Sequence, residues 1–275
     1  MTKQTLNALA RLAQNGDLLA LEQLIAGCQH RIYALSRRML GQLADAQDAT
    51  QEILIKITTS LGTFRGDSEF MTWAHRIAAN HLTSLLRAKA SRQGTFELLA
   101  VDLDKGLRFG ARQKAPAADE PLLAYEVFIE CAQRMLHCLD SSTRMALVLV
   151  DICDLSNDEA AAVLEIGEDA LRQRVSRARR ELAAFLTGSC GLANPNAACH
   201  CLKQVPAALA IGSIQKACVT SPTQDVNDIA AELQVLNELA RATKMLRALP
   251  ELNAPEQLVT EIRKVLSSDR YRSLH

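Results

Sequence analysis

The stretch Leu155-Ser-Asn-Asp-Glu-Ala-Ala-Ala-Val-Leu-Glu-Ile-Gly-Glu-Asp-Ala-Leu-Arg-Gln-Arg-Val-Ser-Arg-Ala-Arg-Arg-Glu-Leu182 predicts two helices separated by a short turn. Ser156 and Glu159 have the spacing of a capping box, in which each side chain bonds to the backbone of the other residue, so a helix is expected to begin there. A second helix is expected to begin near Gly167, where the acidic residues that follow suit a helix N-terminus. Two short helices joined by a tight turn predict a helix-turn-helix.

The second of these helices has one apolar face and several basic ones. Its apolar residues are spaced four, three and four apart, which places them on one side of a helix: Leu171, Val175, Ala178 and Leu182. The other faces suit DNA, because arginine can pair with a guanine edge or a phosphate, and glutamine or serine can read other base edges. These residues are Arg172, Gln173, Arg174, Ser176, Arg177, Arg179 and Arg180. A solvated basic helix in an ordinary bundle is the alternative interpretation.

Amphipathic helices also fill the chain before this unit. Apolar residues recur at intervals of three and four residues over 21–39, and Gly41 is expected to end that helix. Two further helices are expected over residues 44–61 and 70–89. The first ninety residues therefore predict a helical bundle of their own.

The remaining segments differ in character from these bundles. Residues 91–121 lose the helical periodicity and contain several glycines and prolines, which predicts a linker with room for a short docked segment. A cysteine-bearing segment follows the helix-turn-helix. At least two more helices are expected over residues 226–249 and 255–267, where Pro255 suits a first helical position.

The composition fits an all-α protein. Of the 275 residues 48 % are apolar and only 4 % aromatic, and strand-like alternation is rare. The 31 basic and 31 acidic residues cancel, which argues against a protein that coats nucleic acid indiscriminately. No signal-peptide core or membrane-length apolar run is visible, so we expect a cytoplasmic protein without membrane insertion. No motif typical of a hydrolase or a phosphate-binding loop is present, so no enzyme activity is expected.

The eight cysteines fall into two groups. A disulfide framework is not expected in a reducing compartment. Five cysteines are isolated in the sequence and are interpreted as small buried apolar residues: Cys28, Cys131, Cys138, Cys153 and Cys218. The other three form a cluster after the helix-turn-helix.

Residues 139–182 resemble region four of the extracytoplasmic-function sigma factors of the sigma-70 family. The resemblance implies that the Arg-rich helix reads the minus-thirty-five promoter element. By position, Arg172, Gln173, Ser176 and Arg177 match the base-facing residues of that family, and Arg174 and Arg179 match its backbone contacts. This sequence departs from the family at Glu165, where a turn glycine is usual, and at Ala170, where threonine is usual.

The N-terminal unit resembles region two of the same sigma factors. Several short motifs stand in the order and spacing of that region: Asp45–Glu52, Phe64–Ser68, Phe70–Trp73 and Arg76–Asn80. The first motif places acidic residues on one helix face, which would otherwise be interpreted as a solvated face. The resemblance implies that this face binds core RNA polymerase through Asp45, Asp48, Gln51 and Glu52, an interaction of acid with base.

The same resemblance implies a site for unpaired bases of the minus-ten element. Residues at intervals of about one helical turn form a polar stripe that can follow a DNA strand, and the loop before it includes a glycine that permits close backbone approach. The implied contacts are Phe64, Arg65, Gly66, Asp67, Ser68, Arg76, Asn80, Thr83 and Arg87. Trp73 is expected in the core, because it lies on the same side as Phe70.

The segment from Cys190 to Cys201 leaves three interpretations open. Cys190, Cys199, His200 and Cys201 offer soft ligands for zinc, although the common C-x-x-C spacing is absent. A redox switch and a reduced surface loop are the alternatives. The segment also resembles a cysteine motif that follows region four in some of these sigma factors, which implies a regulatory extension. The helices that follow the segment faintly resemble those of zinc-binding anti-sigma proteins.

Together these observations predict an all-α sigma factor of the small class. The expected partners are core RNA polymerase, promoter DNA and an anti-sigma factor. No cofactor is required, and zinc at the Cys190, Cys199 and Cys201 cluster is one of the interpretations left open. The rivals are a stand-alone helix-turn-helix regulator and a scaffold or anti-sigma adaptor that binds only protein. The expected domains are region two over 1–95, a linker over 96–121, region four over 122–188, the Cys-rich segment over 189–205 and a helical regulatory extension over 206–275.

Overall fold

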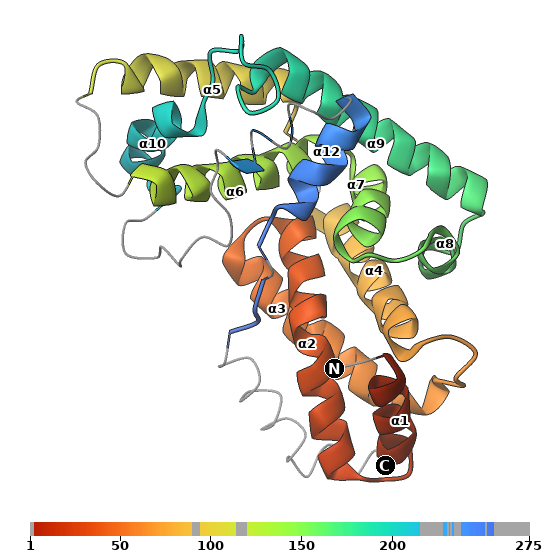
Figure 1. Ribbon diagram of the computed structural model, residues 1–275. Coiled ribbons are helices and arrows are strands. Elements are labelled where there is room, and N and C mark those ends of the chain that lie inside the picture. The colour runs from red at the N-terminus through yellow and green to blue at the C-terminus, as the bar shows by residue number, and fades with distance from the viewer. Residues whose placement is uncertain are drawn as a thin grey trace. The chain divides into compact units, whose positions relative to one another are not determined.

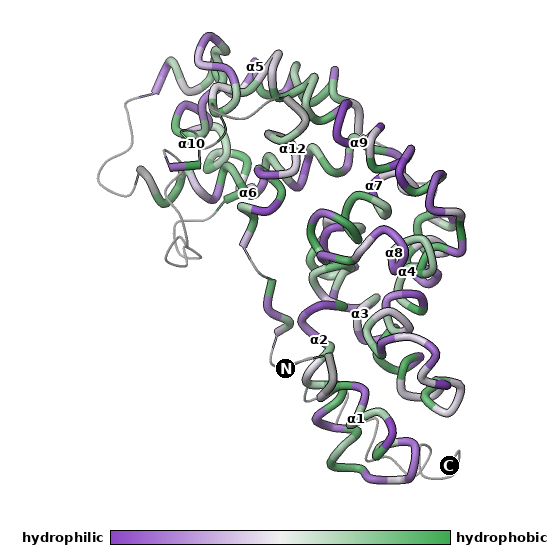
Figure 2. The backbone as a smooth tube through the Cα atoms, turned by 45° about the vertical axis from the view of Figure 1, so that its right-hand side comes forward, coloured by the Kyte–Doolittle hydropathy of each residue, from purple (hydrophilic) through white to green (hydrophobic). Residues whose placement is uncertain are grey.

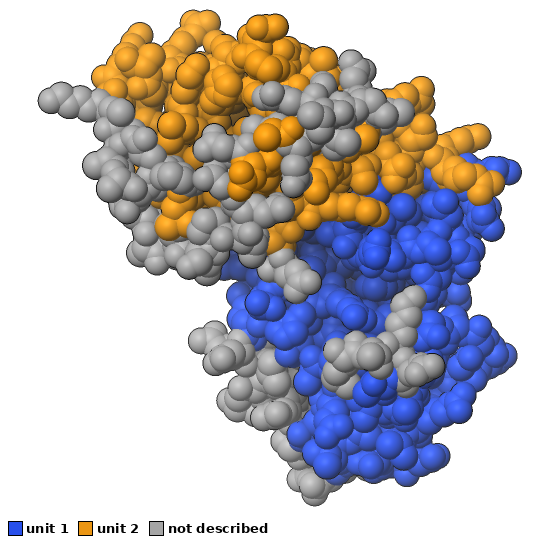
Figure 3. Space-filling view, viewed as in Figure 1, with its two compact units in different colours: residues 1–91, 148–171, 251–275 blue, residues 92–147, 172–250 orange. Residues whose placement is uncertain are grey.

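The described part of the chain is helical, as predicted. The computed structural model describes residues 3–89, 94–113, 120–214, 228–229, 231, 233, 238–250 and 252–255. Figure 1 shows the helices. Within these residues the only strand-like pairing is a single parallel bridge between Cys190 and Cys199. The backbone separates into two compact units, residues 1–91, 148–171 and 251–275 in unit 1 and residues 92–147 and 172–250 in unit 2 (Figure 3).

Unit 1 is built on four N-terminal helices. The long helix α2 packs against its neighbours, and their facing side chains are apolar, as the sequence periodicity predicts. Ile32 of α2, Ile53 of α3 and Phe70 of α4 are fully buried. The four helices are α1 (Lys3–Gln14), α2 (Leu18–Leu40), α3 (Leu43–Thr59) and α4 (Phe70–Lys89).

Unit 1 also contains the first helix of the predicted helix-turn-helix. This short helix, α8 (Asn157–Leu164), packs against α4 and follows a π-helical turn over Val148–Ile152. The predicted capping box is confirmed, because the Ser156 side chain accepts from the Glu159 backbone and Glu159 accepts from the Ser156 backbone. Gly41 ends α2 with φ of 78°, as predicted.

Unit 2 contains α5 (Phe96–Gly110), α6 (Glu120–Cys138), α7 (Ser141–Leu147), α10 (Cys201–Ala210) and α12 (Glu238–Arg247). Helix α9 (Glu168–Ser189) begins in unit 1 and continues in unit 2 from Arg172. Figure 2 shows hydrophobic and hydrophilic residues alternating around the turns of these helices. Helix α10 packs against both α5 and α6. Leu123 and Val127 of α6 share an apolar core with Val205 and Ile214.

The predicted linker therefore includes a formed helix. Helix α5 occupies half of that segment. It is bonded to α10, which comes later in the chain, because the Gln204 amide donates 2.7 Å to the Leu103 carbonyl oxygen. Gly106 and Gly110 permit this approach: a Cβ at Gly110 would lie 2.6 Å from the Lys203 carbonyl oxygen. Of the two helices predicted near the C-terminus, the first is helical at its described residues up to Arg247, and residues 248–249 form a turn. The helix predicted over 255–267 lies outside them, apart from Pro255.

Candidate nucleic-acid interface

The Arg-rich helix α9 has the two-sided character that its sequence predicts. Leu171, Val175, Ala178 and Leu182 are buried. The residues predicted to face DNA bases are exposed, and those predicted to bind the backbone are half-buried. The first set is Arg172, Gln173, Ser176 and Arg177, and the second is Arg174 and Arg179. Arg177 Nε donates 2.9 Å to Glu181 Oε1 in an exposed pair one turn away, so its guanidinium is oriented without being covered.

The turn before α9 contains a residue in an unusual backbone conformation. Glu165 ends α8 with φ of 54° and ψ of 43°, the left-handed region that glycine adopts most easily. Its N–H donates to the Ala161 carbonyl oxygen, so the residue still completes the helix end. The turn therefore forms although its left-handed position is occupied by a residue with a side chain.

The acidic residues of α3 lie partly on its open face. Asp48 and Glu52 are exposed, and Asp45 and Gln51 are half-buried. Glu52 Oε2 lies 3.6 Å from the ring of His81 on α4, and Lys56 Nζ donates 2.6 Å to the other ring nitrogen. Burial, followed by the nearby Lys56 ammonium, lowers the pKa of His81, which favours its neutral ring.

The loop before α4 is held by side chains of α1. Gln14 donates 2.9 Å to the Leu61 carbonyl oxygen and 2.7 Å to that of Phe64. Asn7 accepts from the Phe70 backbone N–H at 2.7 Å and donates to the Glu69 carboxylate at 2.7 Å. These two anchors were not apparent from the sequence, because they join residues 47 to 63 positions apart.

The residues of this loop that were predicted to contact DNA differ in how exposed they are. Phe64 is only 5 % exposed, and its ring lies 5.6 Å from that of Phe70 and 5.5 Å from that of Trp73. Trp73 therefore joins the apolar cluster, as expected, and Phe64 lies there too. Arg65, Gly66 and Asp67 are exposed, Ser68 is half-buried, and Gly66 has φ of +81°. The apolar cluster thus supports an exposed polar tip.

The polar stripe predicted along α4 is unevenly covered. Asn80 and Arg87 are exposed, whereas Arg76 and Thr83 are half-buried. Arg76 Nε is buried without a hydrogen-bond partner. On the same helix His75 is 3 % exposed, and neither of its ring nitrogens has a hydrogen-bond partner. Burial, with a contribution from Arg31, lowers the pKa of His75 to about 4.

The cysteine segment does not bring together the set of ligands that the sequence suggested. Cys190 and Cys199 face each other across the single backbone bridge, but His200 packs against Gly191. Within the described residues no three His, Cys, Asp or Glu side chains already stand at the spacing of a metal site. Cys131 was interpreted as isolated; burial, followed by the Cys190 and Cys199 thiols, raises its pKa.

None of the helices in the described ranges is long and apolar enough to cross a bilayer. Two segments of the chain match known families. Residues 24–92 match sigma-70 region 2, and residues 129–182 match sigma-70 region 4. These segments contain the acidic residues of α3, the loop of residues 64–68, the polar stripe along α4 and the Arg-rich face of α9.

Curated relatives match over the same part of the chain. The ECF RNA polymerase sigma-E factor of Escherichia coli K12 is 31 % identical over 174 residues, which span 63 % of this chain and 90 % of that protein. The RNA polymerase sigma-H factor of Pseudomonas aeruginosa is 31 % identical over 182 residues, which span 66 % and 94 %. Among solved structures, CnrH in complex with the cytosolic domain of CnrY has a TM-score of 0.48 at 26 % identity, covering 66 % of this chain and 97 % of that one.

Proposed function

The chain belongs to the extracytoplasmic-function sigma factors of the sigma-70 family, and we propose how it divides promoter recognition among its surfaces. The α3 face, defined as Asp45, Asp48, Gln51 and Glu52, binds core RNA polymerase. The loop of residues 64–68 and the stripe along α4 bind unpaired bases of the minus-ten element. The exposed Arg-rich face of α9 reads the minus-thirty-five element in duplex DNA.

The observation that carries this proposal is the exposure of α9. Arg172, Gln173 and Ser176 point away from the buried side of an amphipathic helix, and they are the residue types that read base edges in the major groove. The half-buried Arg174 and Arg179 suit phosphate contacts beside them. The α4 side supports the same activity, because an exposed polar loop on a rigid aromatic base suits single-strand binding.

The proposed mechanism uses binding energy and no covalent chemistry. Holding two promoter elements while trapping melted bases lowers the free energy of strand opening. No cofactor is required for these contacts, and no catalytic step is assigned to the chain. We place the protein in the cytoplasm, where promoter DNA and polymerase are found, and we expect an anti-sigma factor as a further partner.

The C-terminal extension is proposed to regulate the sigma regions. Helix α10 contributes Val205 to the core that it shares with α6, and Gln204 holds α5 within the predicted linker. A segment with these contacts can alter the region-four domain without touching DNA. The domain boundaries 1–95, 96–121, 122–188, 189–205 and 206–275 remain part of this proposal.

Reconstituted transcription tests the proposal. Purified chain and core RNA polymerase are incubated with a promoter library from the same genome, and specific, core-dependent initiation is expected. Arg177→Ala should reduce the free energy of promoter binding by about 1–3 kcal/mol and relax the base preference at one position of the minus-thirty-five element. Arg180→Ala removes an equal charge outside the proposed base-reading set and is the matched control.

A second pair of variants tests the core-binding face. Asp48→Lys should reduce the affinity for core polymerase. Glu22→Lys makes the same charge change at an exposed position of α2 and should leave that affinity unchanged. Site-specific DNA binding by the chain alone, with no core binding, would favour a stand-alone regulator. Core binding that is insensitive to Asp48→Lys would remove the α3 face from the proposal.

A further inference from the structure

The first helix of the helix-turn-helix packs against the helix that carries the polar stripe. Helix α8 contacts α4, and the π-helical turn over Val148–Ile152 contacts α2. Residues 148–171 accordingly belong to the same compact unit as residues 1–91 (Figure 3). Since residues 24–92 match region 2 and residues 129–182 match region 4, this packing joins the two promoter-binding regions of the chain.

Helix α4 is buried on two sides. One side faces α3, where the ring of His81 accepts from Lys56. The second side lies about 100° further around the helix, at about 100° per residue. Its buried residues are Met71, His75 and Leu82. Burial and Arg31 of α2 lower the pKa of His75, whereas the Glu159 carboxylate of α8 raises it, which agrees with both helices packing against this second side.

The polar stripe of α4 borders this second side. Arg76 and Thr83, the two stripe residues nearest to it around the helix, are half-buried, whereas Asn80 and Arg87 are exposed. Arg76 Nε and both ring nitrogens of His75 are buried without hydrogen-bond partners. Buried polar groups without partners destabilise the packing that covers them, and water satisfies them when the packing opens. The contact of α8 with α4 therefore lies along the edge of the stripe and is suited to release.

The short turn between α8 and α9 keeps the base-reading residues close to α4. Arg172 follows Leu164, the last residue of α8, by eight positions, so at about 3.5 Å per residue the two are at most about 28 Å apart. The minus-ten and minus-thirty-five elements are about 25 base pairs apart by their names, which is roughly 85 Å of straight duplex at about 3.4 Å per base pair. The shortfall of roughly 55 Å exceeds the whole length of α4, which is about 30 Å. A chain with α8 on α4 therefore cannot hold both elements at once.

We propose that the packing of α8 against α4 is an autoinhibitory contact, which must separate before one chain can bind both promoter elements. The inference rests on the proposed function, since it takes the α4 stripe and the Arg-rich face of α9 as the two DNA-binding surfaces. In the packed form the edge of the stripe is covered and the base-reading residues are held too near it. Core RNA polymerase and promoter DNA together bind the separated form, so the closed fraction of the chain lowers its apparent affinity for promoter DNA.

A distance measurement on the full chain tests the contact. Spin-labelled non-natural amino acids replace Leu19 of α2 and Asn157 of α8, which are both exposed, so the native cysteines are kept. The free chain is expected to give one short, narrow distance distribution, because both positions belong to unit 1. Core RNA polymerase and promoter DNA should replace it by a distribution that is longer by tens of ångströms.

The outcomes separate this inference from the proposed function. A distance that stays short in a complex that initiates transcription overturns the autoinhibitory contact and leaves the proposed function standing. A long or broad distance in the free chain also overturns the contact alone. A chain that binds no promoter in the presence of core RNA polymerase overturns both.

A matched pair of variants loosens the contact. Ala161→Glu puts a carboxylate at a buried position of α8, and Ala162→Glu makes the same change at the next residue, which is exposed. Ala161→Glu should lengthen the label distance in the absence of DNA. It should also raise the apparent affinity of the chain with core for promoter DNA about tenfold, as expected if about nine chains in ten are closed. Ala162→Glu should behave as the parent does.

Circular dichroism establishes folding for each variant. Met71→Ala, on the second side of α4, provides a second measurement should Ala161→Glu fail to fold. Parent-like distances in every folded variant of the buried positions would overturn the inference. A longer distance with weaker promoter binding would also overturn it, because the contact would then assist binding.

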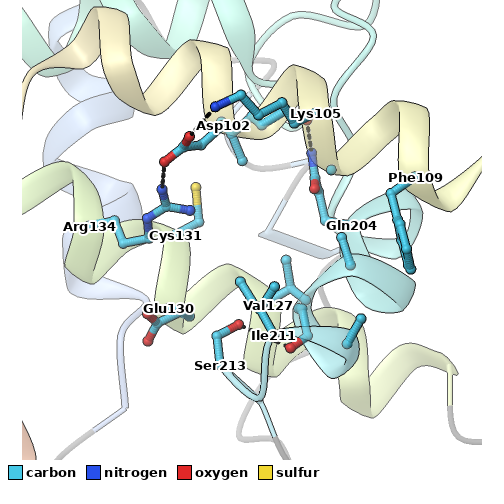
Figure 4. A pocket seen from close by; sticks show the side chains of 15 residues that line it. Asp102, Lys105, Phe109, Val127, Glu130, Cys131, Arg134, Gln204, Ile211 and Ser213 are labelled. Atoms are coloured by element: carbon cyan, nitrogen blue, oxygen red, sulfur yellow. Dashed lines mark hydrogen bonds and ion pairs between the residues drawn. The ribbon is translucent and has the colours of Figure 1, made fainter.

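A variant of unit 2 separates this contact from the packing of the extension. Phe109 lines a cavity of about 520 Å³ between α5, α6 and α10 (Figure 4). Phe109→Ala enlarges that cavity and changes no residue of α4 or α8, so the label distance should keep the parent's value. A longer distance in this variant would assign control of the opening to the extension and overturn the α8–α4 contact as the inhibitory element.

Discussion

At the scale of single residues, Glu165 adopts a left-handed backbone conformation that is unfavourable for a residue with a side chain. A residue with a side chain loses about 1 kcal/mol in the left-handed region that glycine occupies readily. Glu165 adopts that conformation at the end of α8, in the turn that precedes α9. The helix pair forms because the buried faces of α8 and α9 and the capping box determine it more strongly than one turn residue.

We expect Glu165→Gly to stabilise the protein by roughly 0.5–1 kcal/mol, since it removes backbone strain at a residue whose side chain is exposed. Urea unfolding followed by far-UV circular dichroism measures the change. Glu168→Gly, within the first turn of α9, is the control and should destabilise by about 1 kcal/mol. Equal effects of the two substitutions would show that Glu165 is not strained.

His75 makes stability depend on pH. Its pKa is lowered from 6.5 to about 4 by burial and by Arg31, with Glu159 acting in the opposite direction. The unfolded chain therefore binds a proton that the folded chain excludes, so stability is complete above about pH 6.5 and falls as the pH drops toward about 4. The loss attributable to this residue is roughly 3 kcal/mol at the acid end.

His75→Phe keeps a ring but removes the titration, so its stability should fall less between pH 7 and pH 4 than that of the parent. Urea midpoints across this range measure the difference. Replacement of His200, which packs outside the unit 1 core, by Gln should leave the parent's pH profile unchanged. A parallel profile for His75→Phe would mean that another group controls the acid sensitivity.

At the scale of elements, the loop between α3 and α4 depends on α1. Asn7 bonds both the Phe70 N–H and the Glu69 carboxylate, so it fixes the loop where α4 begins. Asn7→Ala leaves a part-buried backbone donor without its partner, which costs about 1–3 kcal/mol. We expect faster amide exchange at residues 64–70 and weaker use of promoters that depend on the minus-ten element.

Hydrogen exchange by mass spectrometry reads the loop directly. Leu12→Ala is a suitable control, because Leu12 lies on α1 but is 49 % exposed. The anchor role would be discarded if Asn7→Ala left exchange in residues 64–70 as slow as in the parent. Loss of promoter use without faster loop exchange would point to a direct contact by Asn7.

Elements set by local rules were predictable from the sequence, and contacts between distant segments were not. Gly41, the capping box at Ser156 and the buried stripe of α9 follow from short-range spacing, and the structure confirms each. The anchors Asn7 and Gln14, by contrast, depend on how α1 packs against residues that follow them by 47 to 63 positions. Cys131 was interpreted as isolated because Cys190 and Cys199, whose thiols influence its pKa, lie 59 and 68 positions later in the chain. His75 carries no sequence signal, since its pKa depends on complete burial.

At the scale of the whole molecule, the extension beyond α9 forms part of the structure of unit 2. Gly110→Ala places a methyl group 2.6 Å from the Lys203 carbonyl oxygen, and a backbone atom must move to relieve the overlap. We expect a loss of about 1–3 kcal/mol, as for overpacking, and faster amide exchange in α10. Gly188→Ala has open space around it and is the control.

Limited proteolysis gives an independent measurement of the same change. Cleavage within residues 201–214 should be faster in Gly110→Ala than in Gly188→Ala, while cleavage within α2 and α3 should be unchanged. Equal protection of α10 in both variants would mean that the glycines of α5 do not govern its docking. Reconstituted transcription by the same pair then reports whether release of the extension raises or lowers promoter use.

The packing of α10 against α5 also bears on the length of the segment that joins residues 24–92 to residues 129–182. Helix α5 has 15 residues and, at about 1.5 Å per residue, spans about 22 Å. The same residues drawn out at about 3.3 Å each would bridge about 50 Å. Holding α5 as a helix therefore shortens these 15 residues of the connecting segment to less than half their drawn-out length. By keeping this segment short, the extension can restrict the distance between promoter elements that one molecule can bridge.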